Sequence, residues 1–249
     1  MSFIFLGNNL IELDLIDSTN DYCKNLLKEG KVEEGTVILA DFQKKGKGLK
    51  GNFWESEKGK NLTFSIILYP EFLNARLQFY ITMSISLGIV EFLDHMSINS
   101  KIKWPNDIYV KNKKIAGILI ENSLIKDRMI SSVAGIGINV NQKDFISNAP
   151  NPTSICLESD KIFDLRNTYK SLIFYLNKWT NLLYNLNYIK IKTNYQRHLF
   201  LVNKNASFTD KNGKFQGTIL GVEETGMLLI KTDSDKPRKY NFKEVIFPC

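Results

Sequence analysis

Short β-rich runs dominate the first 140 residues and alternate with a few helical patterns, and this order restricts the fold more than any other feature. Strand patterns cover residues 9–17, 35–42, 61–70, 101–105 and 130–141, with a hairpin over 107–122 that turns at 111–113. Helical patterns cover residues 18–29, 74–95 and 166–187. The order predicts an α+β fold in which helices pack on a mixed sheet.

A second structural unit is predicted at the C-terminal end. Short strand-like runs follow Leu201–Asn205, and the turn sequences "KNG", "ETG" and "SDKP" separate them. We expect a small β-barrel there, so the predicted domains are residues 1–200 and 201–249.

Composition narrows the class of protein. The chain has 249 residues, enough for a buried core, and no run of about 18 apolar residues that would predict a membrane span. No secretory signal is evident, and three widely spaced cysteines fit a reducing cytoplasm better than a disulfide framework. The net charge of +7 fits either simple solubility or an anionic partner.

Four segments carry polar or glycine-rich patterns that fit a ligand site. They are "DSTN" (17–20), "GKGLKGNFW" (46–54), "KWPND" (103–107) with "KKIAGILIE" (113–121), and "GIGIN" (135–139). "DSTN" alone is also a good helix cap, and the lysine- and glycine-rich loop is also a plausible connector. Gly135 and Gly137 lack the rest of a dinucleotide-binding fingerprint and fit a bulge or tight packing. "KWPND" is the most specific of the four.

Together these segments resemble the biotin–protein ligases in order and spacing, over about residues 9–247. The tail "GKFQGTILGVEETGMLLI" resembles the small SH3-like C-terminal domain of that family. The resemblance implies a catalytic domain similar to class II aminoacyl-tRNA synthetases. It also implies that biotin and ATP form biotinyl-5′-AMP and pyrophosphate, with Mg²⁺. Biotin then passes to one lysine of a biotin carboxyl carrier domain of a carboxylase.

The resemblance also assigns expected roles to individual residues. Lys103 and Lys47 are expected to supply catalytic positive charge, because a carboxylate must attack an anionic phosphate. The expected biotin contacts are Ser18, Thr19, Asn20, Gln43, Gly46, Lys47, Gly48, Leu49, Lys103 and Gly117. The expected ATP contacts are Lys47, Trp54, Lys103, Asn106, Ile118 and Asn139. Asp107 either helps to hold Mg²⁺ or stabilises the turn after Pro105.

The loop departs from the family's usual arginine-rich pattern. Lys47, Leu49 and Asn52 stand where arginines are common. Lysine is a point charge without the bidentate fork of arginine, and leucine cannot pair with phosphate. We therefore expect faster release of the adenylate than from an arginine-rich relative.

The partners follow from the same resemblance. Only about eight residues precede the first predicted strand, too few for a DNA-binding domain, so we expect no operator binding and no repressor role. No membrane partner is expected, and the chain is expected to be a monomer or a homodimer. The open alternatives are a lipoate–protein ligase, a non-enzymatic nucleic-acid-binding protein, and a biotin sensor without turnover.

Overall fold

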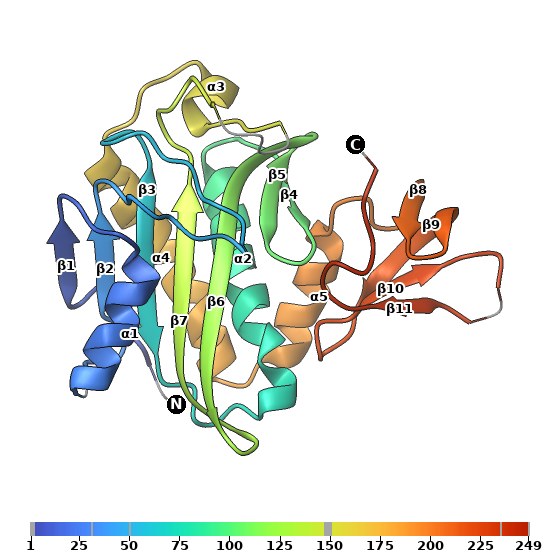
Figure 1. The fold of residues 1–249 in the computed structure, drawn as a ribbon, viewed down its shortest axis with the longest axis horizontal. Coiled ribbons are helices and arrows are strands. Elements are labelled where there is room, and N and C mark those ends of the chain that lie inside the picture. Colours follow the sequence, from blue (N-terminus) through green and yellow to red (C-terminus); the bar gives the residue numbers. More distant parts are fainter. Residues whose placement is uncertain (1–2, 31, 50, 147–150, 235, 249) are drawn as a thin grey trace.

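The computed structural model describes residues 3–30, 32–49, 51–146, 151–234 and 236–248. Within these residues, two sheets lie side by side, and helices cover both faces of the larger one (Figure 1). In spatial order, the larger sheet contains β1 (Leu10–Leu13), β2 (Val37–Ala40), β3 (Leu62–Leu68), β7 (Arg128–Ile138), β6 (Lys113–Ile125), β5 (Asp107–Val110) and β4 (Ser100–Lys103). β1 and β2 are parallel, and every other neighbouring pair is antiparallel.

Helix α1 (Thr19–Glu29) lies on the front face of this sheet in Figure 1. Ser18 caps the helix, because its Oγ accepts a hydrogen bond from the backbone N–H of Asp21 at 3.4 Å. On the buried side of α1, Cys23 packs with Ile38 and Val133 of the sheet. Burial raises the pKa of the Cys23 thiol to about 12, so this cysteine stays protonated at neutral pH.

Helices α2 (Phe79–His95) and α4 (Leu165–Tyr184) cover the opposite face and enclose the main core. The segment Ala75–His95 is long and apolar enough to cross a membrane by composition alone, but 78% of its most apolar stretch is buried inside the molecule. Gly88 lets the two helices approach closely, since a Cβ atom there would lie 3.0 Å from the Leu176 Cα. This segment is therefore the core helix of the domain.

The smaller sheet contains β11 (Arg238–Tyr240), β10 (Leu228–Lys231), β9 (Gly213–Val222) and β8 (Asn205–Asp210), all antiparallel. Helix α5 (Tyr188–His198) leads into it. The two units share one core: the Trp104 indole donates to the Gly226 carbonyl at 2.9 Å, and the Phe79 ring lies 6.0 Å from the Phe242 ring. Phe242, which follows β11, is thus packed against the larger unit.

The predicted α+β class is confirmed, and the structure adds elements that periodicity did not predict. The short helix α3 (Ile155–Ser159) and helix α5 were not expected. Helix α5 is mostly polar and buries only Ile191 and Tyr195, so its apolar stripe is too narrow to stand out. The run predicted as a last strand over 238–247 forms a strand only over Arg238–Tyr240.

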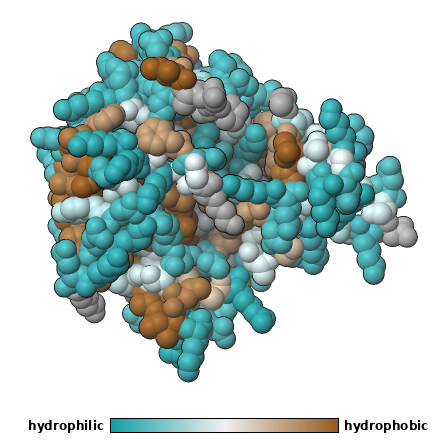
Figure 2. Space-filling view, in the orientation of Figure 1, coloured by the Kyte–Doolittle hydropathy of each residue, from teal (hydrophilic) through white to brown (hydrophobic). Residues whose placement is uncertain are grey.

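The surface of the α1 face is mainly hydrophilic (Figure 2). Apolar atoms gather at the lower end of the sheet in that view. Leu124 and Ile125, the last two residues of β6, are exposed.

Candidate active site

A cavity of about 220 Å³ lies on the α1 side of the sheet. Its walls come from the start of α1, the segment between β2 and β3, strands β6 and β7, and the end of the smaller unit. Figure 1 shows the segment between β2 and β3 crossing in front of β7 and β6. The lining residues are Ser18, Thr19, Asn20, Gln43, Lys47, Gly48, Leu49, Asn52, Phe53, Trp54, Phe64, Pro105, Asn106, Asp107, Lys114, Gly117, Ile118, Leu119, Gly135, Ile136, Gly137, Phe242 and Lys243.

Glycines form part of the cavity floor because no side chain fits there. Gly117 of β6 lies opposite Gly137 of β7 in the sheet. A Cβ atom at Gly137 would lie 2.3 Å from the Trp54 indole, and one at Gly117 would lie 3.0 Å from it. A Cβ atom at Gly135 would lie 2.3 Å from the Asn20 side chain. The glycines thus leave room for the Trp54 ring and for Asn20 directly above the strands.

The end of the cavity at α1 is a connected set of hydrogen-bonding groups. The Gln43 carbonyl oxygen accepts from the Thr19 backbone N–H at 2.8 Å and from the Thr19 hydroxyl at 3.1 Å. The Ser65 hydroxyl lies 2.7 Å from the Thr19 hydroxyl and 2.6 Å from the Asn20 carbonyl oxygen. The Asn20 amide donates to Glu121 at 2.8 Å. These bonds fix the directions in which the side chains can meet a ligand.

A second polar end is built on the β5–β6 hairpin. The Lys114 ammonium pairs with the Asp107 carboxylate at 2.8 Å and lies 5.5 Å from the centre of the Trp54 ring. Asn106 is held by its amide, which donates to the Ile118 carbonyl at 2.7 Å. Lys114 and Asp107 are both mostly buried, so water screens their charges less than it screens surface charges.

The lysine- and glycine-rich loop forms a narrow ribbon beside these groups. The Trp54 N–H donates to the Gly46 carbonyl at 2.9 Å, and the Gly48 N–H donates to the Asn52 carbonyl at 2.8 Å. Lys47 at the ribbon edge pairs with Asp21 of α1 at 2.6 Å. The Trp54 Nε1 atom is buried and has no hydrogen-bond partner within the described protein. A buried indole N–H ordinarily has an acceptor, which marks this wall as suited to a polar ligand group.

Sequence comparison identifies the family of this chain. Residues 12–141 match the biotin/lipoate A/B protein ligase family, and residues 203–247 match the biotin protein ligase C-terminal domain. The chain belongs to the biotin/lipoate A/B protein ligase family.

Individual relatives agree with this assignment. The bifunctional ligase/repressor BirA of Bacillus spizizenii is 30% identical over 240 residues, which is 95% of this chain and 73% of that protein. The Escherichia coli protein of the same name is 32% identical over 170 residues, 67% of this chain and 51% of its own length. Among solved structures, the Aquifex aeolicus biotin protein ligase in complex with biotin and ATP superposes with a TM-score of 0.79 at 29% identity. That superposition covers 97% of this chain and 99% of the other.

Most of the residues predicted from sequence meet at this one cavity. These residues are Ser18, Thr19, Asn20, Gln43, Lys47, Gly48, Leu49, Trp54, Asn106, Asp107, Gly117 and Ile118. Gly46 and Asn139 do not line it. Gly46 closes the base of the loop ribbon. Asn139 is buried, and its amide donates to the Thr153 carbonyl at 2.9 Å.

Lys103 also lies outside the cavity lining, which departs from its predicted central place. Its ammonium donates to the Tyr109 hydroxyl at 3.2 Å and lies 4.5 Å from the centre of the Tyr109 ring. The Phe247 ring near the chain end is 5.7 Å away. Lys103 therefore contacts aromatic residues between the two units, and the lysine that faces the cavity from the β4–β6 region is Lys114.

Sequence reasoning did not single out several lining residues. Lys114 belongs to the segment "KKIAGILIE", but its neighbours do not indicate which lysine faces inward. Gly135 and Gly137 belong to one of the four segments that fit a ligand site, although their own pattern also fits a bulge or tight packing. Phe242 and Lys243 reach the cavity from the smaller unit, and no local pattern marks them.

Proposed function

We propose that this chain is an ATP-dependent biotin–protein ligase. Its biotin carboxylate oxygen attacks the α-phosphorus of ATP, pyrophosphate leaves, and biotinyl-5′-AMP is formed. The amine of an acceptor lysine then attacks the carbonyl carbon of the mixed anhydride, and AMP leaves. The observation that carries the proposal is one cavity with a hydrogen-bonding end at α1 and a cationic end at Lys114.

The hydrogen-bonding end supports biotin over lipoate as the substrate. A ureido ring offers two N–H donors and one carbonyl acceptor, which match the hydroxyl and amide groups of Thr19, Asn20 and Gln43. A dithiolane ring offers no such groups, so it could not hydrogen-bond to these side chains. A site built to hydrogen-bond its substrate discriminates against an analogue that lacks the matching groups.

The cationic end supports the phosphoryl step. We assign Lys114 to the biotin carboxylate and the α-phosphate, because it lines the cavity and is held in place by Asp107. Two negative groups must approach each other there, and a fixed ammonium lowers the repulsion between them. Lys47 supplies a second positive charge from the loop.

Asp107 is the one acidic side chain among the described lining residues, and its carboxylate could serve as a ligand for Mg²⁺. Mg²⁺ that enters with ATP is usually held by substrate phosphates and one or two carboxylates. No cluster of three or more acidic, histidine or cysteine side chains occurs among the described residues. The ion would therefore depend mainly on the nucleotide.

Exchange of labelled pyrophosphate into ATP tests the proposal directly. We expect exchange that depends on biotin and is absent with lipoate at the same concentration. Exchange with lipoate alone would establish the lipoate ligase. Tight biotin binding without exchange would establish a sensor.

Leu49 lines the cavity, which supports the expected fast release of the adenylate. Leu49→Arg should slow that release several-fold, because a guanidinium adds a charge-assisted hydrogen bond to phosphate. Rapid gel filtration of protein loaded with labelled biotin and ATP measures the rate. Leu49→Gln is the matched polar control, and equal release from both variants would contradict the role of charge.

For the acceptor we propose only a class of protein, a biotin carboxyl carrier domain. The absence of a repressor role, the cytoplasmic location and the choice between monomer and homodimer stay predictions.

A further inference from the structure

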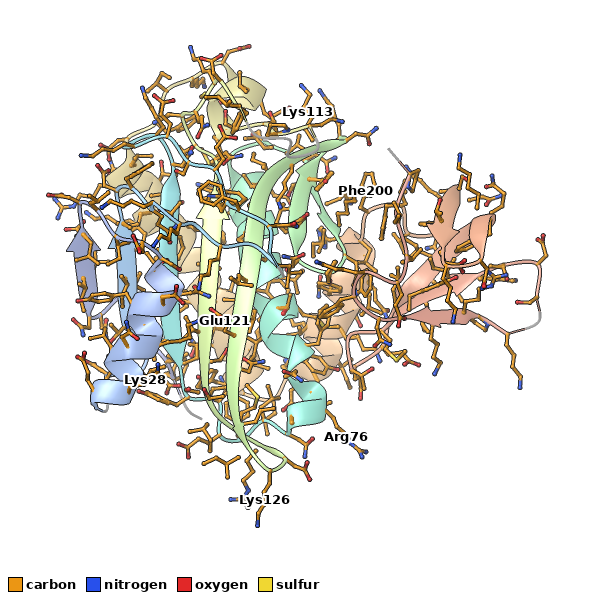
Figure 3. All side chains as sticks on the ribbon, viewed as in Figure 1. Lys28, Arg76, Lys113, Glu121, Lys126 and Phe200 are labelled. Carbon is orange, nitrogen blue, oxygen red and sulfur yellow. The ribbon has the colours of Figure 1, made fainter. Side chains whose placement is uncertain are left out.

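A chain of charged side chains connects the loop to the sheet across the start of α1. Lys47 pairs with one oxygen of Asp21 at 2.6 Å, and Lys24 pairs with the other oxygen at 2.8 Å. Lys24 also pairs with Glu121 of β6 at 2.8 Å. Glu121, labelled in Figure 3, accepts in turn from the Asn20 amide at 2.8 Å. The loop lysine is thus linked to the same network that fixes the α1 end of the cavity.

The ribbon is fastened to the domain mainly at its base. The backbone N–H groups of Lys44 and Lys45 donate to the Ile16 and Asp17 carbonyls at 2.8 and 2.9 Å. Lys47 lies farther along, where the ribbon crosses the cavity, and there the Asp21 carboxylate reaches it from α1. Both ends of this ion pair are partly exposed, so the pair is a moderate constraint.

The charges around Asp21 leave its carboxylate able to pair with Lys47 of the loop. Lys24 is shared between Asp21 and Glu121, so it does not fully neutralise Asp21. Burial would raise the pKa of Asp21, but hydrogen bonds from Lys24 and Lys47 outweigh it and lower that pKa. Asp21 is therefore ionised at neutral pH, and the pair is lost only as the pH falls through the lowered pKa.

We propose that Asp21 is a positioning residue that holds the lysine- and glycine-rich loop over the cavity through Lys47. This inference deepens the proposed function, because a loop held in place both presents Lys47 and shields the reactive adenylate from water. Asp21 itself is outside the cavity lining and acts through Lys47.

Limited trypsin digestion tests the positioning role without depending on ligase activity. The loop contains several lysines, so cleavage there reports how often the ribbon leaves the cavity. We expect Asp21→Asn to be cleaved in the loop about threefold to fivefold faster than wild type, the upper part of the range for one partly exposed ion pair. Mass spectrometry of the first fragments identifies the cleavage sites.

The chain offers a matched control in Asp17, which pairs with Lys45 of the same loop at 2.8 Å. That pair is at the base of the ribbon and more exposed. Asp17→Asn should change loop cleavage by less than twofold. Equal acceleration by both variants would show a general effect of charge at the start of α1 and would overturn the proposal.

A charge swap separates holding the loop from binding the ligand. Asp21→Lys combined with Lys47→Asp should restore slow cleavage after Lys44 and Lys45, two trypsin sites that the swap keeps, because the pair re-forms with reversed signs. The double variant should still release the adenylate several-fold faster than wild type, because residue 47 then places a carboxylate near the phosphate. Cleavage as fast as in Asp21→Asn would overturn the proposal. If exchange is absent in wild type while the cleavage pattern holds, only the proposed function fails.

Discussion

Lys114→Met is expected to reduce biotin-dependent pyrophosphate exchange by about 100- to 1,000-fold, the usual cost of removing one preorganised charge-stabilising group. Lys114 lines the cavity and is held by Asp107, so the variant removes the positive charge that we assign to the reacting groups. Exchange at saturating biotin and ATP measures the loss. Thermal unfolding should show that the fold is retained.

Two other lysines serve as controls for this result. Lys113 is the exposed neighbour, and Lys113→Met should leave exchange within about twofold of wild type, as expected for a surface position. Lys103→Met should have a much smaller effect than Lys114→Met, because the Lys103 ammonium lies against Tyr109. The opposite order, with exchange lost only in Lys103→Met, would restore Lys103 as the central cation.

Gly137→Ala is expected to weaken biotin binding by about 5- to 150-fold, which corresponds to the usual cost of overpacking. The new methyl group would lie 2.3 Å from the Trp54 indole, so the ring or the strand must move. Isothermal titration with biotin measures the affinity, and tryptophan fluorescence reports the displaced ring.

Gly117→Ala gives a graded comparison, because its methyl group would lie 3.0 Å from the same ring and needs a smaller shift. Its affinity should fall less than that of Gly137→Ala. If steric contact with the indole is the cause, Trp54→Ala should recover part of the binding in the Gly137→Ala background. Wild-type affinity in Gly137→Ala would contradict the role of this glycine.

Much of the site followed from local sequence. Ser18, Thr19 and Asn20 form a helix start, and a helix start has exposed N–H groups and capping side chains wherever it occurs. The loop over 46–54 was recognised from glycines among lysines, a composition that suits close approach to a ligand. Both predictions needed only residues that are neighbours in the chain.

The choice between Lys103 and Lys114 could not be made in that way. Both lysines lie on the same face of the sheet, because Lys103 pairs with Asp107 and Lys114 pairs with Tyr109, two residues farther along β5. They differ in their contacts: the Lys103 ammonium lies against the Tyr109 and Phe247 rings, whereas the Lys114 ammonium pairs with Asp107 near Trp54. Alternation of residues along a strand does not predict such contacts, so the role expected for Lys103 stays a prediction beside the one proposed for Lys114.

The sequence by itself determined the α+β class, the order of the main strands and helices, and the motifs that mark the family, because these depend on local patterns. Only the tertiary structure decided which lysine faces the cavity, why β6 and β7 need glycines beneath Trp54, and how Asp21 meets Lys47. It also brought Phe242 and Lys243 to a cavity that begins at Ser18. These contacts join residues far apart in the chain, so they arise from sheet register and domain packing.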